Sequence, residues 1–266
     1  MSCDDPQTAR DRPECSRITI KDLHYSVPGK EVLHGVDLLA EPSEILCVMG
    51  TSGCGKSTLL NCLDGLVRPS SGEIWVGDAQ IVGMRETDLN RVRERIGMVF
   101  QYSALFDSLN VFENVAFGLR RRRKLPLQRM REIVAEKLAV VGLPGTEDLF
   151  PSQLSGGMKK RVGLARAIAL EPEILLYDEP TSGLDPVVAS MVDELIMEMR
   201  DKLRVTSVVV SHNITSIFRI SDKVAMLGNG KVLAYGTVPE IQNSQDPIVR
   251  QFIEGRSHGP LEVAAR

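Results

Sequence analysis

Residues 50–58 read Gly50-Thr51-Ser52-Gly53-Cys54-Gly55-Lys56-Ser57-Thr58. This is the pattern G-x-x-x-x-G-K-[ST] of a phosphate-binding loop. Its glycines let the backbone curl, so that successive N–H groups point inward and form a nest for phosphate oxygens. Lys56 can reach the outer phosphates as a point charge, and the Ser57 hydroxyl can hold Mg²⁺.

The segments on either side of this loop have the character that the motif requires. The apolar run Ile45-Leu46-Cys47-Val48-Met49 precedes the loop and predicts a buried strand. The run Leu59-Leu60-Asn61-Cys62-Leu63 follows it and predicts a helix, whose N-terminal dipole would add to phosphate binding. An ordinary glycine-rich turn is the alternative, but the strand–loop–helix context favours the phosphate-binding loop.

The composition indicates an ordinary soluble globular protein of 266 residues, with 43% hydrophobic and 25% charged residues. The net charge of -3 provides no excess of positive charge that would attract nucleic acid, so we expect no nucleic-acid partner. The sequence has no apolar run of 18 or more residues, the length that would predict a membrane span. Residues 1–16 are polar and lack the apolar core of a signal peptide, so we expect a flexible N-terminal tail. The five cysteines form no C-x-x-C pair and indicate reduced thiols.

Short β-rich runs alternate with helical runs over most of the chain. We predict strands at 18–20, 31–39, 73–76, 96–100, 174–177, 207–210 and 224–227, and helices at 111–119, 127–141, 158–170, 186–203 and 214–220. Strands that alternate with helices form a parallel sheet covered on both faces, so the expected fold class is α/β. Residues 102–170 show helical periodicity and predict a helical subdomain inserted in the chain.

Two motifs after the phosphate-binding loop narrow the class of protein. The stretch Leu154-Ser155-Gly156-Gly157 opens a helical run, and an apolar strand later ends at Asp178-Glu179. In these motifs, their order and their distance, the chain resembles the ATP-binding cassette (ABC) ATPases from about Ile18 to Leu261. The resemblance implies a P-loop (RecA-like) nucleotide-binding domain with an inserted helical subdomain and a small antiparallel β part. The expected boundaries are 1–16 for the tail, 17–245 for the ATPase domain (helical subdomain about 102–170) and 246–266 for a C-terminal tail.

The resemblance implies an ATP hydrolase that uses ATP and Mg²⁺. Asp178 would hold Mg²⁺ through water, and Glu179 would be the general base that orients and deprotonates the attacking water. Gln101, which follows a predicted strand, would touch both Mg²⁺ and the attacking water. His212, after another predicted strand, would contact the γ-phosphate. Without the resemblance, each of these side chains is an ordinary polar residue at the end of a strand.

The resemblance also implies a head-to-tail homodimer. The stretch Ser155-Gly156-Gly157 offers a good N-cap and two glycines that allow close backbone approach, which makes a positive helix end. In the family this edge caps ATP that is bound to the loop of Lys56 in the partner copy. Asp185 is the implied carboxylate of a loop that crosses the interface. Tyr25 matches an aromatic residue that stacks on adenine, and a surface tyrosine is the alternative.

Three features together look like the MCE-associated (Mla-type) lipid-transport ATPases. The signature continues with Met158, where amino-acid and sugar importers usually have glutamine, and the stretches 101–115 and 246–260 complete the pattern. The implied partners are an integral membrane permease, whose coupling helix would contact residues 102–106, and an MCE-domain lipid-binding protein. The resemblance leaves room for a small STAS-type regulatory subunit. It places the chain peripherally on the cytoplasmic side of the inner (or plasma) membrane.

Two other functions share the motor motifs and stay open at this point. The nearer alternative is the ATPase of a polar amino-acid importer, because only the signature and the C-terminal segment separate it from the lipid-transport type. The other is a soluble non-transport ABC ATPase, which usually has two cassettes or a long coiled-coil insertion. Within the C-terminal tail, Phe252 and Ile253 are apolar residues that favour a docking patch.

Two further features of the sequence each allow two interpretations. Cys54 inside the phosphate-binding loop is either a small residue that fits there or a thiol sensitive to oxidation. The run Arg120-Arg121-Arg122-Arg123-Lys124 is either a solvated charged face or a contact for anionic lipid head groups.

Overall fold

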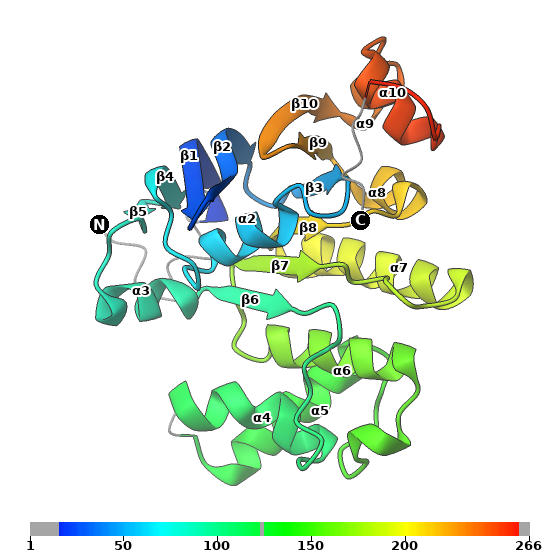
Figure 1. The fold of residues 1–266 in the computed structure, drawn as a ribbon. Helices are drawn as coiled ribbons and strands as arrows, with labels where there is room; N and C mark the ends of the chain where they lie inside the picture. The colour runs from blue at the N-terminus through cyan, green and yellow to red at the C-terminus, as the bar shows by residue number, and fades with distance from the viewer. Residues whose placement is uncertain (1–15, 123–124, 261–266) are drawn as a thin grey trace.

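The computed structural model describes residues 16–122 and 125–260, which form two sheets and two groups of helices (Figure 1). A four-stranded antiparallel sheet has the order β2-β1-β4-β5, and a six-stranded sheet has the order β10-β9-β3-β8-β7-β6. In the larger sheet, the neighbours from β9 to β6 pair in parallel, and β10 adds an antiparallel edge to β9. The strands are β1 Ile18–Val27, β2 Lys30–Ala40, β3 Ile45–Gly50, β4 Ser71–Val76, β5 Ala79–Gln80, β6 Ile96–Val99, β7 Ile174–Asp178, β8 Thr206–Val210, β9 Lys223–Gly228 and β10 Lys231–Thr237.

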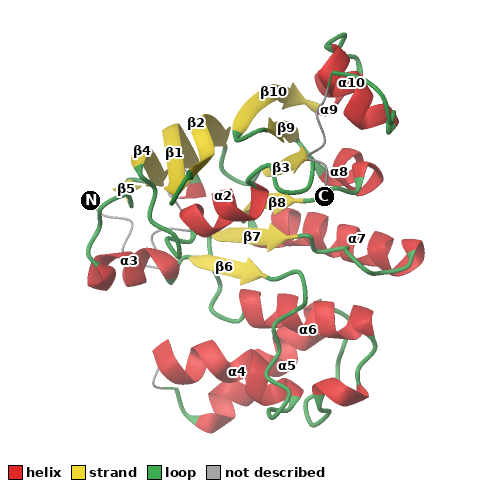
Figure 2. Ribbon diagram, in the orientation of Figure 1, coloured by secondary structure: helices red, strands yellow, loops and turns green. Residues whose placement is uncertain are grey.

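The helices divide into those that cover the sheets and those that stand apart. In Figure 2, α4, α5 and α6 gather on one side of β6, away from the antiparallel sheet. Helix α6 packs on α4 and α5 within this group and also contacts β6 and α7. The helices are α2 Lys56–Leu63, α3 Glu86–Arg93, α4 Val111–Arg122, α5 Leu127–Val140, α6 Gly156–Ile168, α7 Pro186–Leu203, α8 Ile214–Ile220, α9 Val238–Gln242 and α10 Pro247–Glu254, with a 3₁₀ turn at Pro151–Gln153.

Alternate residues of the central strands enter two different cores. In β3, Ile45, Cys47 and Met49 pack into the core that includes residues of α4 to α8, whereas Leu46 and Val48 pack with α2 and the antiparallel sheet. Because successive side chains of a strand point to opposite faces, this division means that both faces of the sheet are covered. All six residues of β3 and all five of β8 are accordingly buried.

The predicted fold class is confirmed, and the predicted helices and strands all have counterparts in the structure. Residues 17–245 contain both sheets, and residues 102–170 contain α4, α5 and α6. The structure adds three short helices that the sequence pattern did not predict, α3, α9 and α10, and the strands β5 and β10. The predicted tail at 1–16 falls almost entirely outside the described residues. Among the described residues, no helix is both long enough and apolar enough to cross a membrane.

The segment expected as a C-terminal tail contains a helix. Residues 247–254 form helix α10, whose N-terminus is capped by Asp246 Oδ1, which accepts hydrogen bonds from the amides of Ile248 (2.8 Å) and Val249 (3.2 Å). Val249 is fully buried, and Phe252 and Ile253 pack against the core of the same chain. Phe252 and Ile253, which favour a docking patch, are half-buried against the core of their own chain, and contact of this segment with a partner stays a prediction.

Candidate functional site

The phosphate-binding loop lies between the end of β3 and the start of α2, where the sequence places it. Gly55 caps α2 in a left-handed conformation, with φ of 110°. A Cβ atom at Gly55 would lie 2.8 Å from Leu33 Cδ2 and 3.2 Å from the carbonyl oxygen of Val32, so this close approach to β2 and the positive φ both favour glycine. The loop is also tied to the β9–β10 turn, since the amide of Gly230 donates to the carbonyl of Cys54 (3.2 Å). Ser52 and Gly53 are exposed at the tip, and Thr58 is half-buried in the first turn of α2.

The ammonium of Lys56 lies across the loop. Nζ donates hydrogen bonds to the carbonyls of Gly50 (2.8 Å) and Thr51 (2.8 Å), and the residue is only 8% exposed. The loop thus combines a fixed cation with backbone N–H groups at a helix N-terminus. That combination attracts the oxygens of a polyphosphate.

Cys54 is buried beneath the loop. Its Sγ lies 3.9 Å from Lys56 Nζ, and the residue is 5% exposed. Burial raises the pKa of the Cys54 thiol above its usual range, and the charge of Lys56 lowers it by less. Because the thiolate is the reactive form, these surroundings favour the interpretation of Cys54 as a small packing residue.

We therefore expect Cys54 to react with iodoacetamide at pH 7 at least about tenfold more slowly in the native chain than in the chain unfolded in urea. The physical reason is twofold, since the thiol is buried and stays protonated. Mass spectrometry of the peptide that contains Cys54, sampled over time, measures both rates in one experiment. Equal rates in the folded and unfolded chains would show instead that Cys54 is an exposed, oxidation-sensitive thiol.

Ser57 and Asp178 meet beside the loop. Ser57 Oγ donates a hydrogen bond to Asp178 Oδ1 (3.1 Å), at the C-terminal end of β7. Burial raises the pKa of Asp178, while the hydrogen bond from Ser57 and the charge of Lys56 oppose the rise. The structure therefore places two of the three side chains predicted for Mg²⁺, Ser57 and Asp178, next to each other.

The donor chemistry of this pair fits Mg²⁺. Among the residues that the structure describes, no three His, Cys, Asp or Glu side chains form a metal-binding group. Mg²⁺ does not require one, because it is typically held by one or two carboxylates together with substrate phosphates and water. A hydroxyl and a carboxylate oxygen beside a phosphate-binding loop match that preference.

Glu179 and His212 also come together. His212 Nδ1 lies 2.8 Å from Glu179 Oε2, and the amide of His212 approaches the same oxygen at 3.4 Å. Glu179 follows β7 with φ of 48°, a left-handed conformation that is uncommon for a residue with a side chain, and its amide donates to the carbonyl of Val210 (2.9 Å). The Glu179 side chain is 12% exposed and that of His212 is 64% exposed. A largely buried carboxylate therefore faces an accessible imidazole at the edge of the sheet.

Gln101 and Tyr25 lie at two other elements, and neither forms a hydrogen bond with Ser57 or Asp178 within the part of the chain that the structure describes. Gln101 follows β6, and its Nε2 lies 3.5 Å from Ser182 Oγ, just beyond β7. Tyr25 on β1 pairs with Leu33 of β2, the residue that lies beneath Gly55. The half-buried Tyr25 ring therefore belongs to the same part of the antiparallel sheet that supports the phosphate-binding loop.

The signature stretch stands apart from these residues. Ser155 caps α6, and its Oγ accepts a hydrogen bond from the amide of Met158 (3.2 Å). A Cβ atom at Gly157 would lie 2.5 Å from Val188 Cγ1, so Gly157 allows α6 to pack closely on α7. Helices α2 and α6 lie on opposite sides of β6 and β7 (Figure 1). One copy of the chain thus carries the phosphate-binding loop and the signature at separate places.

Asp185 has a structural role that the sequence motif did not reveal. Its Oδ1 accepts hydrogen bonds from the amides of Val187 (3.1 Å) and Val188 (3.1 Å), so it caps α7. The residue is nevertheless exposed, next to the signature stretch. Capping accounts for an aspartate at this position without a partner chain.

Lys160 is a cation at this site that sequence reasoning did not single out. It is 7% exposed and donates hydrogen bonds to the backbone carbonyls of Gln101 and Glu179 (3.3 Å for the second). The only sequence signal for it is its place on α6, one helical turn after the signature.

The basic run begins in the last turn of α4 and is only partly described. The guanidinium of Arg120 lies 5.7 Å from the centre of the Phe112 ring, and that of Arg121 lies 5.3 Å from the Phe117 ring. Arg123 and Lys124 lie outside the described residues. Contact between this run and anionic lipid stays a prediction.

Comparison with known proteins places this geometry in a family. Residues 33–182 match the family model described as "ABC transporter". The chain is 40% identical over 244 residues to the intermembrane phospholipid transport system ATP-binding protein MlaF of Escherichia coli K12, and the match covers 92% of this chain and 91% of that protein. It is 42% identical over 240 residues to the methionine import ATP-binding protein MetN of Carboxydothermus hydrogenoformans, with 89% of this chain and 71% of that protein covered.

A solved structure shows the same fold. The dimeric structure of the ATP-binding cassette MJ0796, in a post-hydrolysis state bound to ADP and Pi, matches with a TM-score of 0.76 and 30% sequence identity. The match covers 83% of this chain and 98% of that one. The architecture described above is therefore that of a nucleotide-hydrolysing cassette.

Proposed function

Because this chain belongs to the ABC transporter family, as an ATP-binding and ATP-hydrolysing subunit, we propose that it powers the transport of phospholipid or another lipid across the cell envelope. The observation that carries the proposal is the 40% identity to MlaF over 91% of the length of that protein. The residues Met158 to Arg161 after the signature, which differ from the importer pattern, add independent support.

The chain's own residues suggest how it would hydrolyse ATP. Lys56 and the N–H groups of the loop would hold the β- and γ-phosphates, and the Tyr25 ring would stack on adenine. Glu179 would orient the attacking water and accept its proton, while His212, 2.8 Å from Glu179, would contact the γ-phosphate. Mg²⁺, when bound by Ser57, Asp178 and Gln101, would neutralise charge on the phosphates.

The separation of the signature from the loop supports a head-to-tail homodimer. In this arrangement Ser155, Gly156 and Gly157 of one copy would cap ATP held by the Lys56 loop of the other, as the N-terminus of α6 offers free N–H groups. Asp185 lies beside the signature stretch and would cross the interface. Two ATP molecules would then join the copies, and hydrolysis would release them.

An exposed aromatic surface supports a membrane permease as partner. Tyr102 is 86% exposed and Phe106 is 43% exposed, and the Phe106 ring lies 4.7 Å from that of Phe117 on α4. Exposed aromatic clusters of this kind usually serve as docking sites. A coupling helix of a permease that binds here would hold the chain peripherally on the cytoplasmic side of the inner (or plasma) membrane.

The remaining partners follow from the lipid-transport proposal. An MCE-domain lipid-binding protein would exchange lipid with the permease, and a small STAS-type subunit would regulate the ATPase. The similarity to MetN keeps the amino-acid importer as a second candidate, in which a soluble solute-binding protein takes the place of the MCE protein. A soluble non-transport ATPase would need neither an MCE-domain protein nor a solute-binding protein.

Affinity purification from detergent-treated native membranes, with mass spectrometry of proteins and lipids, separates these functions. We expect a multi-span permease, an MCE-domain protein and phospholipid to accompany the chain. The variant Tyr102→Arg tests the docking surface, because this exposed ring lies on it. Loss of the ring should release the permease. A soluble amino-acid-binding protein among the companions would favour the importer, and the absence of any membrane partner would favour the soluble class.

A further inference from the structure

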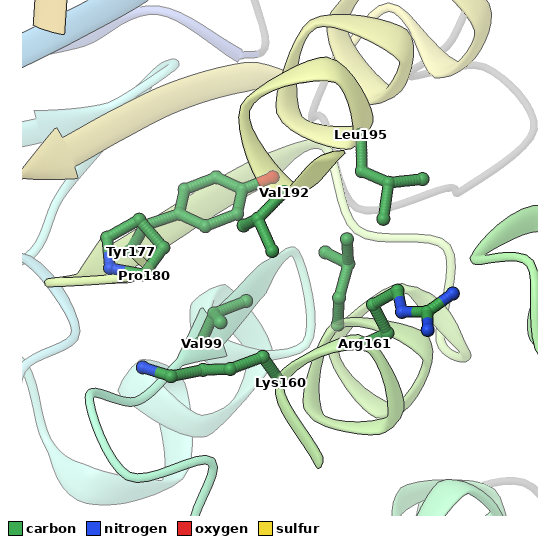
Figure 3. Close-up of a pocket in the computed structure, with 8 residues that line it drawn as sticks. Val99, Lys160, Arg161, Tyr177, Pro180, Val192 and Leu195 are labelled. Carbon is green, nitrogen blue, oxygen red and sulfur yellow. The ribbon is translucent and has the colours of Figure 1, made fainter. Parts of the chain in front are cut away.

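Lys160 lies in a narrow cleft between the signature helix and the catalytic sheet (Figure 3). The cleft is lined by apolar side chains of β6, of α7 and of the segment that follows β7, among them Val99, Leu195 and Pro180. Its volume of about 10 Å³ holds about one water molecule at most, so it offers no space for a ligand. The buried ammonium of Lys160 is therefore explained by its contacts with the protein and not by a bound ligand.

The hydrogen-bond partners of Lys160 are two backbone carbonyls from different elements. Nζ donates to the carbonyl of Gln101, at the end of β6, and to the carbonyl of Glu179, at the end of β7 (3.3 Å). No carboxylate among the described residues forms an ion pair with Lys160. Burial lowers the pKa of this lysine, and the charges of Glu179 and Asp178 oppose that effect. Keeping an ammonium here is unfavourable unless its contacts compensate for the lost hydration.

The backbone that Lys160 holds is in an uncommon conformation. Glu179 has φ of 48°, and Ser103 and Ala104, which follow Gln101 closely, have φ of 60° and 45°. Left-handed conformations of residues with side chains persist only where their surroundings fix them. A charged hydrogen bond to the carbonyl of Glu179 is such a constraint.

A second basic residue of α6 continues the same pattern. Arg166 donates to the carbonyls of Ser103 (2.7 Å) and Ala104 (2.6 Å). Gly163, between Lys160 and Arg166, faces Ser103, with only 3.5 Å from an added Cβ to the nearest Ser103 atom. Residues three apart lie on one face of a helix, so this face of α6 follows the loop from 101 to 104.

We propose that Lys160 is a positioning residue, which fixes the backbone at Gln101 and Glu179 to the signature helix. One ammonium that binds both carbonyls sets the separation of the two side chains predicted to act on the attacking water. Because Ser155 caps α6 and Gly156 and Gly157 open it, the same contact links the signature to the catalytic edge of the sheet. The inference rests on the roles proposed above for Gln101 and Glu179.

The test compares Lys160→Met, Lys160→Arg and the control Lys159→Met in the full chain. Lys159 is the adjacent half-buried lysine and has no role in the proposed site. The first readout needs no nucleotide: chymotrypsin cleavage after the exposed Tyr102, identified by mass spectrometry, reports how firmly the loop is held. The second readout separates kcat from the dissociation constant for ATP.

We expect Lys160→Met to be cleaved after Tyr102 about tenfold faster and to lose about tenfold or more in kcat, as loss of hydrogen bonds from a charged group predicts. Its affinity for ATP should stay within about threefold, because Lys160 does not touch the phosphate-binding loop. Lys160→Arg should restore both values to within about threefold, since a guanidinium can donate to two carbonyls. Lys159→Met should behave as the wild type.

Cleavage and kcat within twofold of the wild type in Lys160→Met would overturn the proposal. A parallel loss of ATP affinity and thermal stability that arginine does not rescue would also overturn it, because it would indicate a general packing role. Lys160→Gln, which keeps one donor group, provides an intermediate variant if the methionine variant does not fold. Full turnover by Glu179→Gln would overturn the assignment of Glu179 as general base. It would leave the positioning role of Lys160 intact, because chymotrypsin cleavage after Tyr102 does not depend on the role of Glu179.

Discussion

Glu179→Gln is expected to bind ATP as the wild type does and to hydrolyse it about 10²–10⁴-fold more slowly, the usual contribution of a general base. The amide has the size and hydrogen-bonding length of the carboxylate, so its contact with His212 can persist. The amide cannot accept the proton of the attacking water. The left-handed backbone at residue 179 is held by the carbonyl of Val210 and by Lys160, neither of which involves the altered atoms.

Two measurements establish this result. ATP binding is followed by titration calorimetry, and turnover is followed by phosphate release under saturating ATP. Because the variant should bind ATP without consuming it, sedimentation should show an ATP-dependent dimer that lasts longer than that of the wild type. Glu194→Gln, an exposed carboxylate on α7, is the matched control and should keep full turnover. Undiminished hydrolysis by Glu179→Gln would mean that another group activates the water.

The sequence was sufficient for the parts of the site that depend on motif and order. The phosphate-binding loop, Asp178 and Glu179 each follow a buried apolar run, and parallel strands bring such ends to one edge of a sheet. That is why Ser57 and Asp178, separated by 121 positions in the chain, are in hydrogen-bond contact.

Other features depend on properties that a local sequence does not carry. Lys159 and Lys160 are two adjacent lysines that the sequence does not distinguish. Their positions around α6 leave Lys159 half-buried and turn Lys160 into the protein, where it is buried. The acceptors of Lys160 are backbone carbonyls, which every residue has, so no pattern of side chains could identify them. The same holds for Phe252 and Ile253, whose partners in the core come from segments far away in the chain.

Lys56→Ala is expected to weaken ATP binding about 100-fold, which corresponds to about 3 kcal/mol at 1.4 kcal/mol per factor of ten. Charge-assisted hydrogen bonds of about 1.5–3 kcal/mol each account for a loss of that size. The loop itself also loses its internal brace, since Lys56 Nζ binds the carbonyls of Gly50 and Thr51 (2.8 Å each). Both effects act in the same direction on ATP affinity, because a looser loop presents its N–H groups less uniformly.

Titration calorimetry with ATP and with ADP distinguishes the two contributions. Lys56 is predicted to act on the outer phosphates, so the loss should be larger for ATP than for ADP, whereas a purely structural brace would weaken both nucleotides equally. Lys202→Ala is the matched control, because this exposed lysine forms an ion pair with Glu198 on α7 and lies outside the loop. An ATP dissociation constant within about threefold of the wild-type value would contradict the assignment of Lys56 to the phosphates.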